Sequence, residues 1–313
     1  MNLLLHDDPL GKQKIRWKYV TLKIIVIVTS AGLLTGTVLM KVIIGPSGVD
    51  VNGVVVFLRR VEMSAKEFEG KVVLVTGGSR GIGRAICHRL ASEGARISVN
   101  YQGNQRAAEA TLADVEDMGS EGIVIQADVG KPDEVTRMVR DTESRLGPID
   151  FLVTNAGIAE MESPNEMHFE AFKRMMEVNV DGTYLPLMEV GKGMRSRGFG
   201  RVVCIASIAG LRPRASQAAY GVSKAAVIAL ARNVAEGWAP AVRINSIAPG
   251  LIETDMIQVM SAEQRSAIAE ATPMKRLGQP DEIAELTAFL LSERASFITG
   301  QCYVASGGRV TLP

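Results

Sequence analysis

Between Lys71 and the C-terminus, short β-branched runs alternate with longer segments that carry apolar residues at helical spacing. This alternation predicts parallel strands joined by right-handed helical crossovers. The strand runs lack in-and-out alternation, as expected for a parallel sheet covered on both faces. We therefore predict an α/β fold, a doubly wound parallel sheet of about seven strands with helices on both faces. Strands are expected at residues 72–75, 97–99, 123–125, 151–153, 202–205, 244–247 and near 303, and helices at 82–92, 105–118, 133–146, 169–195, 218–238 and 281–292.

Charge and cysteine spacing restrict the partners of the chain. Lysine plus arginine (35) nearly cancels aspartate plus glutamate (34), so no overall field favours nucleic acid, and a small-molecule substrate is expected. The cysteines Cys87, Cys204 and Cys302 are widely spaced, and with three histidines they show no metal-ligand spacing. We therefore expect a reducing compartment and no metal, with Cys87 and Cys204 as small buried side chains.

A glycine-rich segment at residues 76–83 follows the first predicted strand and opens the first predicted helix. Glycine lets the backbone turn tightly there and approach a pyrophosphate, which the free N–H groups and the positive helix end stabilise. The second strand ends in Asn100, Tyr101 and Gln102, so it offers no acidic group for a ribose 2′-hydroxyl. That favours a 2′-phosphate paired with Arg80, and the predicted cofactor is NADP(H).

Tyr220 and Lys224 lie four residues apart, on one face of the helix predicted to continue to Trp238. A phenol is a weak acid near neutral pH, and a nearby positive charge is expected to lower its pKa. Ser207 follows the strand at 202–205 and is expected to project from its carboxyl end toward the same crevice. The three residues are therefore candidates for proton transfer to or from a substrate oxygen.

From residue 70 to residue 308 the sequence resembles the short-chain dehydrogenase/reductase family, which implies a Rossmann-type catalytic domain. Five motifs in order carry the resemblance. They are the turn at 76–83, Asp128-Val129, Thr154-Asn155-Ala156-Gly157, Ser207 with Tyr220 and Lys224, and Pro249-Gly250. The family's usual first asparagine in the third of these motifs is Thr154 here.

The resemblance implies a catalytic tetrad of Asn179, Ser207, Tyr220 and Lys224. Tyr220 would act as acid or base, Ser207 would bind the substrate oxygen, Lys224 would bind the nicotinamide ribose, and Asn179 would support a water relay. It also places Asp128 at the adenine, Asn155 and Gly157 on the adenosine side, and Thr254 at the carboxamide. The whole expected cofactor set is Gly77, Ser79, Arg80, Gly81, Ile82, Gly83, Asn100, Asp128, Val129, Asn155, Ala156, Gly157, Tyr220, Lys224, Pro249, Gly250 and Thr254.

Within the family, residues 245–256 and 276–300 are most similar to 3-oxoacyl-[acyl-carrier-protein] reductases. This implies NADPH-dependent reduction of a 3-oxoacyl thioester, linked to acyl carrier protein or coenzyme A in fatty acid biosynthesis, by a homotetramer. Two departures weaken docking of an acidic carrier: Leu185 replaces an arginine, and residues 236–240 lack a basic residue, although Arg212 and Arg214 could substitute. The alternatives are a dehydrogenase of a sugar, steroid or other ketone, and a non-catalytic NADP(H)-binding scaffold. Residues 251–274 are expected to form a helical lid.

The first 66 residues are expected to be an extension to a single catalytic domain at 67–313. Residues 24–40 are 17 residues without a charge behind a basic flank, at the lower limit for crossing a bilayer. A spanning segment would carry the catalytic domain across the membrane, away from the cytosolic cofactor supply, and we expect a cytoplasmic catalytic domain. Three alternatives stay open: a membrane anchor at 24–40, a leader with the functional start near Met63, and a folded extra element.

Overall fold

The computed structural model describes residues 66–160, 165–257 and 260–311, apart from the side chain of Met256, and the backbone of 18–26, 36–45 and 48–49. The chain divides into two units, Met1–Ala65 and Lys66–Pro313. In the first unit, β1 (Lys18–Val26) pairs antiparallel with β2 (Gly36–Gly45), from Lys18 opposite Ile44 to Val26 opposite Gly36. The short strand β3 (Gly48–Val49) pairs antiparallel with the end of β2.

The apolar run at 24–40 falls partly inside this small sheet. Its first residues belong to β1 and its last to β2, while residues 27–35 lie outside the described part. Among the residues that the structure describes, no helix has both the length and the apolar character needed to cross a membrane. The anchor, leader and extra-element alternatives stay predictions.

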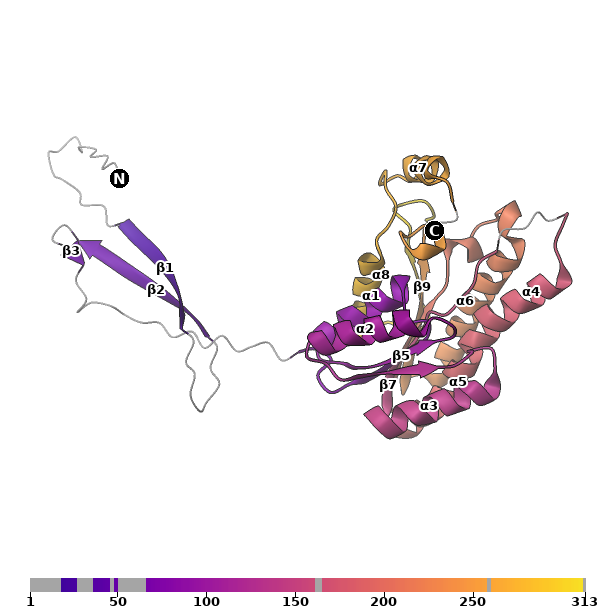
Figure 1. Cartoon of the computed structure of the whole chain (residues 1–313), viewed down its shortest axis with the longest axis horizontal. Coiled ribbons are helices and arrows are strands. Elements are labelled where there is room, and N and C mark those ends of the chain that lie inside the picture. The colour runs from indigo at the N-terminus through magenta and orange to yellow at the C-terminus, as the bar shows by residue number, and fades with distance from the viewer. Residues whose placement is uncertain are drawn as a thin grey trace. The chain divides into compact units, whose positions relative to one another are not determined.

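The second unit is built on a seven-stranded sheet in the order β10-β9-β8-β7-β4-β5-β6, and every neighbouring pair is parallel (Figure 1). The predicted doubly wound Rossmann-type sheet is confirmed. The chain starts in the middle, at β4, and winds outward in both directions, so the order reverses between β4 and β7. Ligands bind such sheets at this switch point, beyond the carboxyl ends of the strands. The strands are β4 (Val72–Val75), β5 (Arg96–Tyr101), β6 (Gly122–Gln126), β7 (Ile149–Thr154), β8 (Gly200–Ile205), β9 (Val242–Pro249) and β10 (Cys302–Ala305).

Helices cover both faces of the sheet. One apolar cluster joins α1, α2 and α8 to the sheet, and a second joins α3, α5 and α6 to the opposite face. Figure 1 shows α2 and α3 on opposite sides of the strands. The helices are α1 (Gly81–Ser92), α2 (Gln105–Asp117), α3 (Pro132–Leu146), α4 (Phe169–Met176), α5 (Gly182–Arg197), α6 (Ala218–Trp238), α7 (Ala262–Glu270) and α8 (Pro280–Leu291).

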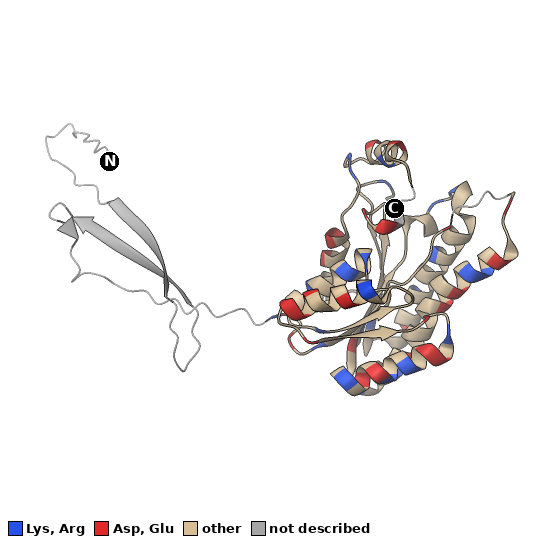
Figure 2. Ribbon diagram, viewed as in Figure 1, with Lys and Arg blue, Asp and Glu red and all other residues tan. Residues whose placement is uncertain are grey.

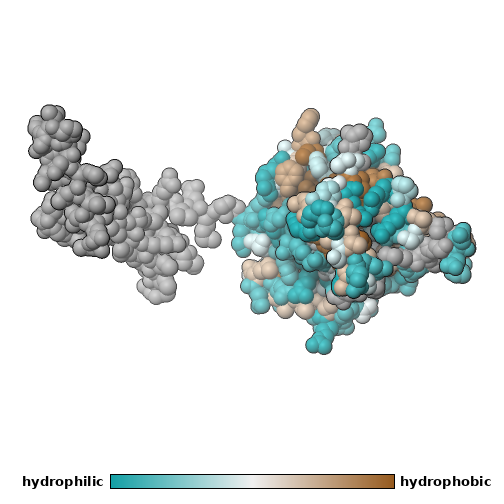
Figure 3. Space-filling model, turned by 90° about the horizontal axis from the view of Figure 1, so that it is seen from above, coloured by the Kyte–Doolittle hydropathy of each residue, from teal (hydrophilic) through white to brown (hydrophobic). Residues whose placement is uncertain are grey.

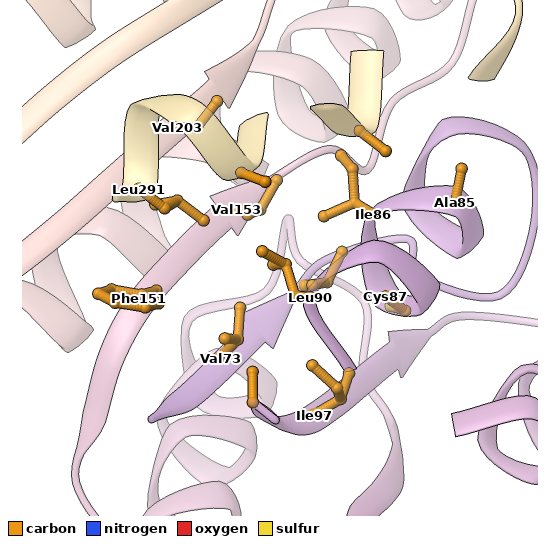
Figure 4. Close-up of a cluster of buried hydrophobic side chains, with 14 of the residues drawn as sticks. Val73, Ala85, Ile86, Cys87, Leu90, Ile97, Phe151, Val153, Val203 and Leu291 are labelled. Atoms are coloured by element: carbon orange, nitrogen blue, oxygen red, sulfur yellow. The ribbon is translucent and has the colours of Figure 1, made fainter. Parts of the chain in front are cut away.

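The core of the first cluster holds large aliphatic and aromatic side chains with almost no exposed surface (Figure 4). Leu90 of α1 and Ile97 of β5 are fully buried, and Phe151 of β7 is 1% exposed. Burial of each such side chain stabilises the fold by about 1.5–3 kcal/mol. The predicted burial of Cys87 and Cys204 is confirmed, and both are free thiols.

The surface carries charges of both signs. Figure 2 shows Lys and Arg interspersed with Asp and Glu on α3 and α4, in keeping with the nearly balanced composition. Figure 3 shows a face of this unit that is largely hydrophilic, with smaller hydrophobic areas between. The most exposed large apolar side chains of the described residues are Phe297 and Phe169, at 103% and 69%.

The helix predicted over 169–195 is wrong as a continuous α-helix. A π-helical turn, η2 (Glu177–Asp181), separates α4 from α5. Its sequence, Glu-Val-Asn-Val-Asp before Gly182, is poor in strong helix formers, and Asn179 at its centre bonds to segments outside the helix. π-Helical turns inside longer helices commonly mark functional sites.

Candidate active site

The glycine-rich turn connects β4 to α1 with a backbone that only glycine tolerates at several positions. Gly77 and Gly81 have φ values of +62° and +53°, in the left-handed region. A Cβ on Gly77 would lie 2.9 Å from Cα of Ala156, and a Cβ on Gly83 would lie 2.2 Å from the carbonyl oxygen of Gly77. The turn is therefore packed backbone against backbone, and α1 begins directly behind it.

Buried or half-buried polar side chains hold this turn in place. Oδ1 of Asn100 accepts a hydrogen bond from Gly77 N at 3.1 Å, and its Nδ2 donates to the oxygen of Ala127 at 3.1 Å. Nδ2 of Asn155 donates to the oxygens of Thr76 (3.1 Å) and Gly77 (2.9 Å). The hydroxyl of Thr76 accepts from the amides of Asn155 and Ala156. The side chain of Asn100 is thus used in fixing the turn.

A groove of about 670 Å³ runs along the turn and the carboxyl ends of β5, β6 and β7. Gln102, Gly103 and Asn104, which follow β5, line it without an acidic group. Twelve of the predicted cofactor residues line it: Gly77, Ser79, Arg80, Gly81, Ile82, Asn100, Asp128, Val129, Asn155, Ala156, Gly157 and Thr254. Gly83 lies in the first turn of α1 and does not line this groove, because it packs against Gly77.

Asp128 follows β6 and is 7% exposed. One carboxylate oxygen, Oδ1, accepts from the amide of Gly130 at 3.0 Å. The other, Oδ2, accepts from Nε2 of Gln102 at 2.9 Å and from Nη2 of Arg174 at 3.3 Å. Asp128 therefore holds the loop after β5 and helix α4 around this end of the groove.

A second cavity, of about 360 Å³, contains Ser207, Tyr220 and Lys224. Pro249 and Gly250, predicted as cofactor residues, line this cavity and not the groove. The cavity and the groove share Asn155, Gly157 and Thr254, so the two spaces meet at the carboxyl end of β7. Three of the four predicted tetrad residues thus come together where the two spaces adjoin.

Tyr220 lies in the first turn of α6, and Ser207 lies directly after β8. The Ser207 hydroxyl accepts from the amide of Ala209 at 3.1 Å and caps the short helix η3 (Ile208–Gly210), which fixes its position. Burial raises the pKa of Tyr220, and a hydrogen bond with Ser207 offsets part of that rise. The phenol is therefore protonated and able to donate.

Lys224 is 4% exposed, and its Nζ donates to the oxygen of Ile205 at 2.9 Å and lies 5.8 Å from the centre of the Tyr220 ring. Burial lowers its pKa to about 8, against a smaller opposing effect of Cys204. The expected lowering of the Tyr220 pKa is not found in this structure, because burial outweighs the hydrogen bond with Ser207 and raises it. Burial acts on both groups and disfavours both charges, and the ammonium is directed to Ile205.

Asn179, the fourth predicted residue, is fully buried and lines neither space. Its Oδ1 accepts from Ile158 N at 2.8 Å, and its Nδ2 donates to the Ile158 oxygen at 3.0 Å and to Oγ of Ser223 at 2.9 Å. Gly157 lies between Asn179 and Lys224. A Cβ on this glycine would lie 3.0 Å from Oδ1 of Asn179 and 3.3 Å from Nζ of Lys224. The π-helical turn thus positions the segment beside Lys224.

Ser223 was not predicted from the sequence. Its hydroxyl donates to the oxygen of Tyr220 at 2.8 Å and accepts from Asn179, so it ties the start of α6 to the π-helical turn. A serine before a lysine in a helix is too common a pattern to indicate this role. The only available signal was its place three residues after Tyr220, on the same face of the helix.

The predicted lid is helical in part. It contains the short helix η5 (Asp255–Ile257) and α7, whose capping box is formed by Ser261 and Gln264. Ile257, Met260 and Ile268 line the cavity over Tyr220 and Lys224. Residues 258–259 lie outside the described part. The segment predicted as a lid thus gives this cavity an apolar wall.

The turn and groove fit a dinucleotide. Gly77, Gly81 and Gly83 have no Cβ to obstruct the turn at the switch point, and the N-cap of α1, Arg80, makes no side-chain hydrogen bond to the first turn. The free N–H groups of the first turn of α1 and the positive end of this helix are therefore available to bind a phosphate in the groove. The adjoining cavity brings a hydroxyl pair and an amine to one place, which suits proton transfer at a carbonyl or alcohol oxygen.

Comparison with known proteins agrees with this geometry. A family model described as "Enoyl-(Acyl carrier protein) reductase" matches residues 77–309. The chain is 37% identical over 239 residues to a 3-oxoacyl-[acyl-carrier-protein] reductase of Staphylococcus epidermidis, covering 76% of this chain and 98% of that protein. It is 38% identical over 242 residues to the Synechocystis protein of that name, covering 77% and 97%. A solved short-chain type dehydrogenase/reductase from Mycobacterium marinum superposes with a TM-score of 0.76 at 31% identity, covering 79% and 98%.

The chain belongs to the short-chain dehydrogenase/reductase family. It is an oxidoreductase of that family, whose members act on small molecules with a nicotinamide cofactor.

Proposed function

We propose that the protein is an NADP(H)-dependent reductase of 3-oxoacyl thioesters. One observation carries the reaction type: Ser207, Tyr220 and Lys224 line a single cavity that adjoins the dinucleotide groove. The acyl substrate is supported by the names of the relatives, which match over nearly their whole length. The partly apolar wall of the cavity suits a short acyl chain. A homotetramer is proposed from the family resemblance, and the exposed Phe169 and Phe297 are apolar surface for it to cover.

The preference for NADP(H) rests on Arg80, whose surroundings differ from those of the neighbouring Arg84. Arg84, one turn into α1, is paired with Asp114. Arg80 is exposed, lines the groove and has no acidic partner among the described residues. Across the groove from the turn, the loop after β5 adds no carboxylate that would repel a phosphate. A guanidinium in that position suits the 2′-phosphate of NADP(H).

The protein's own groups handle the proton. When bound, NADPH supplies a hydride to the carbonyl carbon of the substrate. Ser207 donates a hydrogen bond to the carbonyl oxygen and orients it. Tyr220 transfers its phenolic proton to that oxygen as the carbon–oxygen π pair becomes a lone pair, which leaves an alcohol and a tyrosinate. The Lys224 ammonium, about 6 Å from the ring centre, stabilises the tyrosinate.

Asn179 and Ser223 act as positioning residues. Asn179 binds both polar groups of the Ile158 backbone, and Ser223 holds the backbone of Tyr220. Together they fix the segment at Gly157 and Ile158 and the start of α6, the two parts of the chain beside Lys224. We propose that Asn179 supports proton relay to solvent through this placement.

Turnover of S-3-oxobutanoyl-N-acetylcysteamine with NADPH tests the proposal, alongside a panel of sugars, steroids and cyclic ketones. We expect the thioester to have the highest kcat/KM. A higher value for another ketone would overturn the acyl assignment. Binding of NADPH without turnover of any carbonyl compound would establish the scaffold alternative instead.

A further inference from the structure

Three arginines line the substrate cavity. Arg212 and Arg214 follow η3, a few residues after Ser207, and Arg309 follows the last strand, near the C-terminus. All three line the cavity that contains Tyr220. Burial lowers the pKa of Arg309, and the nearby charges of Arg212 and Arg214 lower it further.

Within the described residues, none of the three guanidinium groups has an acidic partner. Other arginines of this unit are compensated: Arg276 pairs with Glu282, Arg294 with Glu67 and Arg174 with Asp128. Like charges held near one another repel, so a folded protein keeps such a cluster at a net electrostatic cost. An anion placed among the three would remove the repulsion.

Arg309 is held in place before any ligand arrives. Its Nη1 donates to the oxygen of Ile268 at 3.0 Å and approaches Oγ1 of Thr272 at 3.5 Å, at the end of lid helix α7. Ile268 itself lines the cavity. A half-buried guanidinium fixed in the cavity wall suits a small anion that enters the cavity, more than the face of a partner protein.

We propose that the natural substrate carries an anionic group, a carboxylate or a phosphate, that Arg212, Arg214 and Arg309 bind while the carbonyl lies at Tyr220. This inference rests on the proposed ketone reduction and narrows its substrate to anionic small molecules. The neutral part of the substrate lies along the apolar wall formed by Ile257, Met260 and Ile268.

Three thioesters of the same 3-oxobutanoyl group test the inference. They are the neutral N-acetylcysteamine thioester, the carboxylate-bearing thioglycolate thioester and the phosphate-bearing coenzyme A thioester. For the wild-type protein we expect kcat/KM to be about tenfold or more higher for an anionic thioester than for the neutral one. The ratio should fall as the ionic strength rises from about 0.05 to about 0.5 M. Comparison of the two anionic thioesters distinguishes a carboxylate from a phosphate.

The double variant Arg212→Gln/Arg214→Gln should reduce the anionic-to-neutral ratio to less than about threefold. Arg309→Lys keeps the charge and should preserve most of the ratio. Arg140→Ala is the matched control, since it removes an exposed arginine of α3 that lines neither cavity nor groove. Thermal unfolding and NADPH binding establish that each variant is folded.

Isothermal titration with the unreactive butanoyl thioesters of N-acetylcysteamine and thioglycolate gives a readout that does not depend on turnover. The butanoyl thioester of coenzyme A is titrated alongside them, and equal affinities of the wild type for all three compounds would overturn the anion site, whichever carbonyl compound is reduced. A double variant that loses activity only toward a carrier-protein-linked substrate would also overturn it and assign the arginines to protein docking. If the anionic thioester binds more tightly but no thioester is reduced, the anion site holds and the proposed function fails.

Discussion

Tyr220 and Lys224 lie one turn apart on α6. Burial raises the pKa of Tyr220 and lowers that of Lys224, so it favours the neutral form of both groups. In the proposed mechanism Tyr220 donates the proton, and Ser207 cannot replace it, because an aliphatic hydroxyl is a much weaker acid than a phenol. Tyr220→Phe should therefore lower kcat by about 100-fold or more, with NADPH affinity within a few-fold of wild type. Steady-state kinetics and NADPH fluorescence titration measure both, and substantial residual turnover would remove Tyr220 from this role.

The buried Lys224 makes the stability depend on pH. Its pKa is about 8 in the folded protein and near 10.5 when unfolded, so the unfolded state binds more protons between these values. Stability therefore rises with pH across this window, as the cost of the buried charge disappears. Relative to Lys224→Met, which has no titration there, the wild-type free energy of unfolding should rise by about 3 kcal/mol from pH 8 to pH 10.5. Urea denaturation at several pH values measures it; a flat difference would show that Lys224 keeps its charge.

We propose that Arg80 sets the preference for NADP(H) over NAD(H). Arg80→Glu places a negative charge where the 2′-phosphate is proposed to lie, so the KM for NADPH should rise about tenfold or more while the KM for NADH changes little. Kinetics with the two cofactors measure the contrast. Arg84→Gln, which removes a paired arginine of the same helix, serves as the control. An equal change for both cofactors would contradict the assignment.

At the scale of elements, the glycine turn sets how α1 approaches the sheet. A Cβ on Gly83 would meet the backbone oxygen of Gly77 at 2.2 Å, and a backbone oxygen cannot move aside as a flexible side chain can. Gly83→Ala should weaken NADPH binding by about 10- to 100-fold or lower the thermal stability, at a cost of about 1–3 kcal/mol. Gly237→Ala on α6 has no atom within 4 Å of the added Cβ and should be neutral or slightly stabilising. Similar behaviour of the two variants would contradict the close packing of the turn.

Elements with a strong local pattern were predictable from the sequence. The bounds of β4 and α6 agree with the predicted ranges. In a parallel α/β fold, a short β-branched run forms a buried strand, and a long segment with one apolar face forms a helix that packs on the sheet. The π-helical turn was not predictable, because the hydrogen bonds of Asn179 to Ile158 and Ser223 hold it and these partners are distant in the sequence. The place of Arg309 in the cavity was not predictable for the same reason. It lies 85 residues after Lys224, and only the tertiary fold brings it near Arg212.

At the scale of the whole molecule, the chain combines a unit at Lys66–Pro313 with an N-terminal unit of different character. The unit at Lys66–Pro313 contains the seven-stranded sheet, both clusters of core residues and every residue of the proposed site. We therefore propose that a chain starting at Met63 folds and reduces its substrate with a kcat within about twofold of the full chain. Thermal unfolding and steady-state kinetics on both chains test this. Loss of activity on truncation would show that the first residues contribute to catalysis.

The position of Arg309 also matters for how the protein is handled. Arg309 lines the substrate cavity and is followed directly by Val310 and Thr311, so a purification tag fused shortly after Thr311 would begin close to that cavity. An acidic tag there would compete with an anionic substrate for the guanidinium groups, and a bulky tag of any charge would obstruct the end of α7. Kinetic constants for this enzyme are therefore best measured with an N-terminal tag or with none.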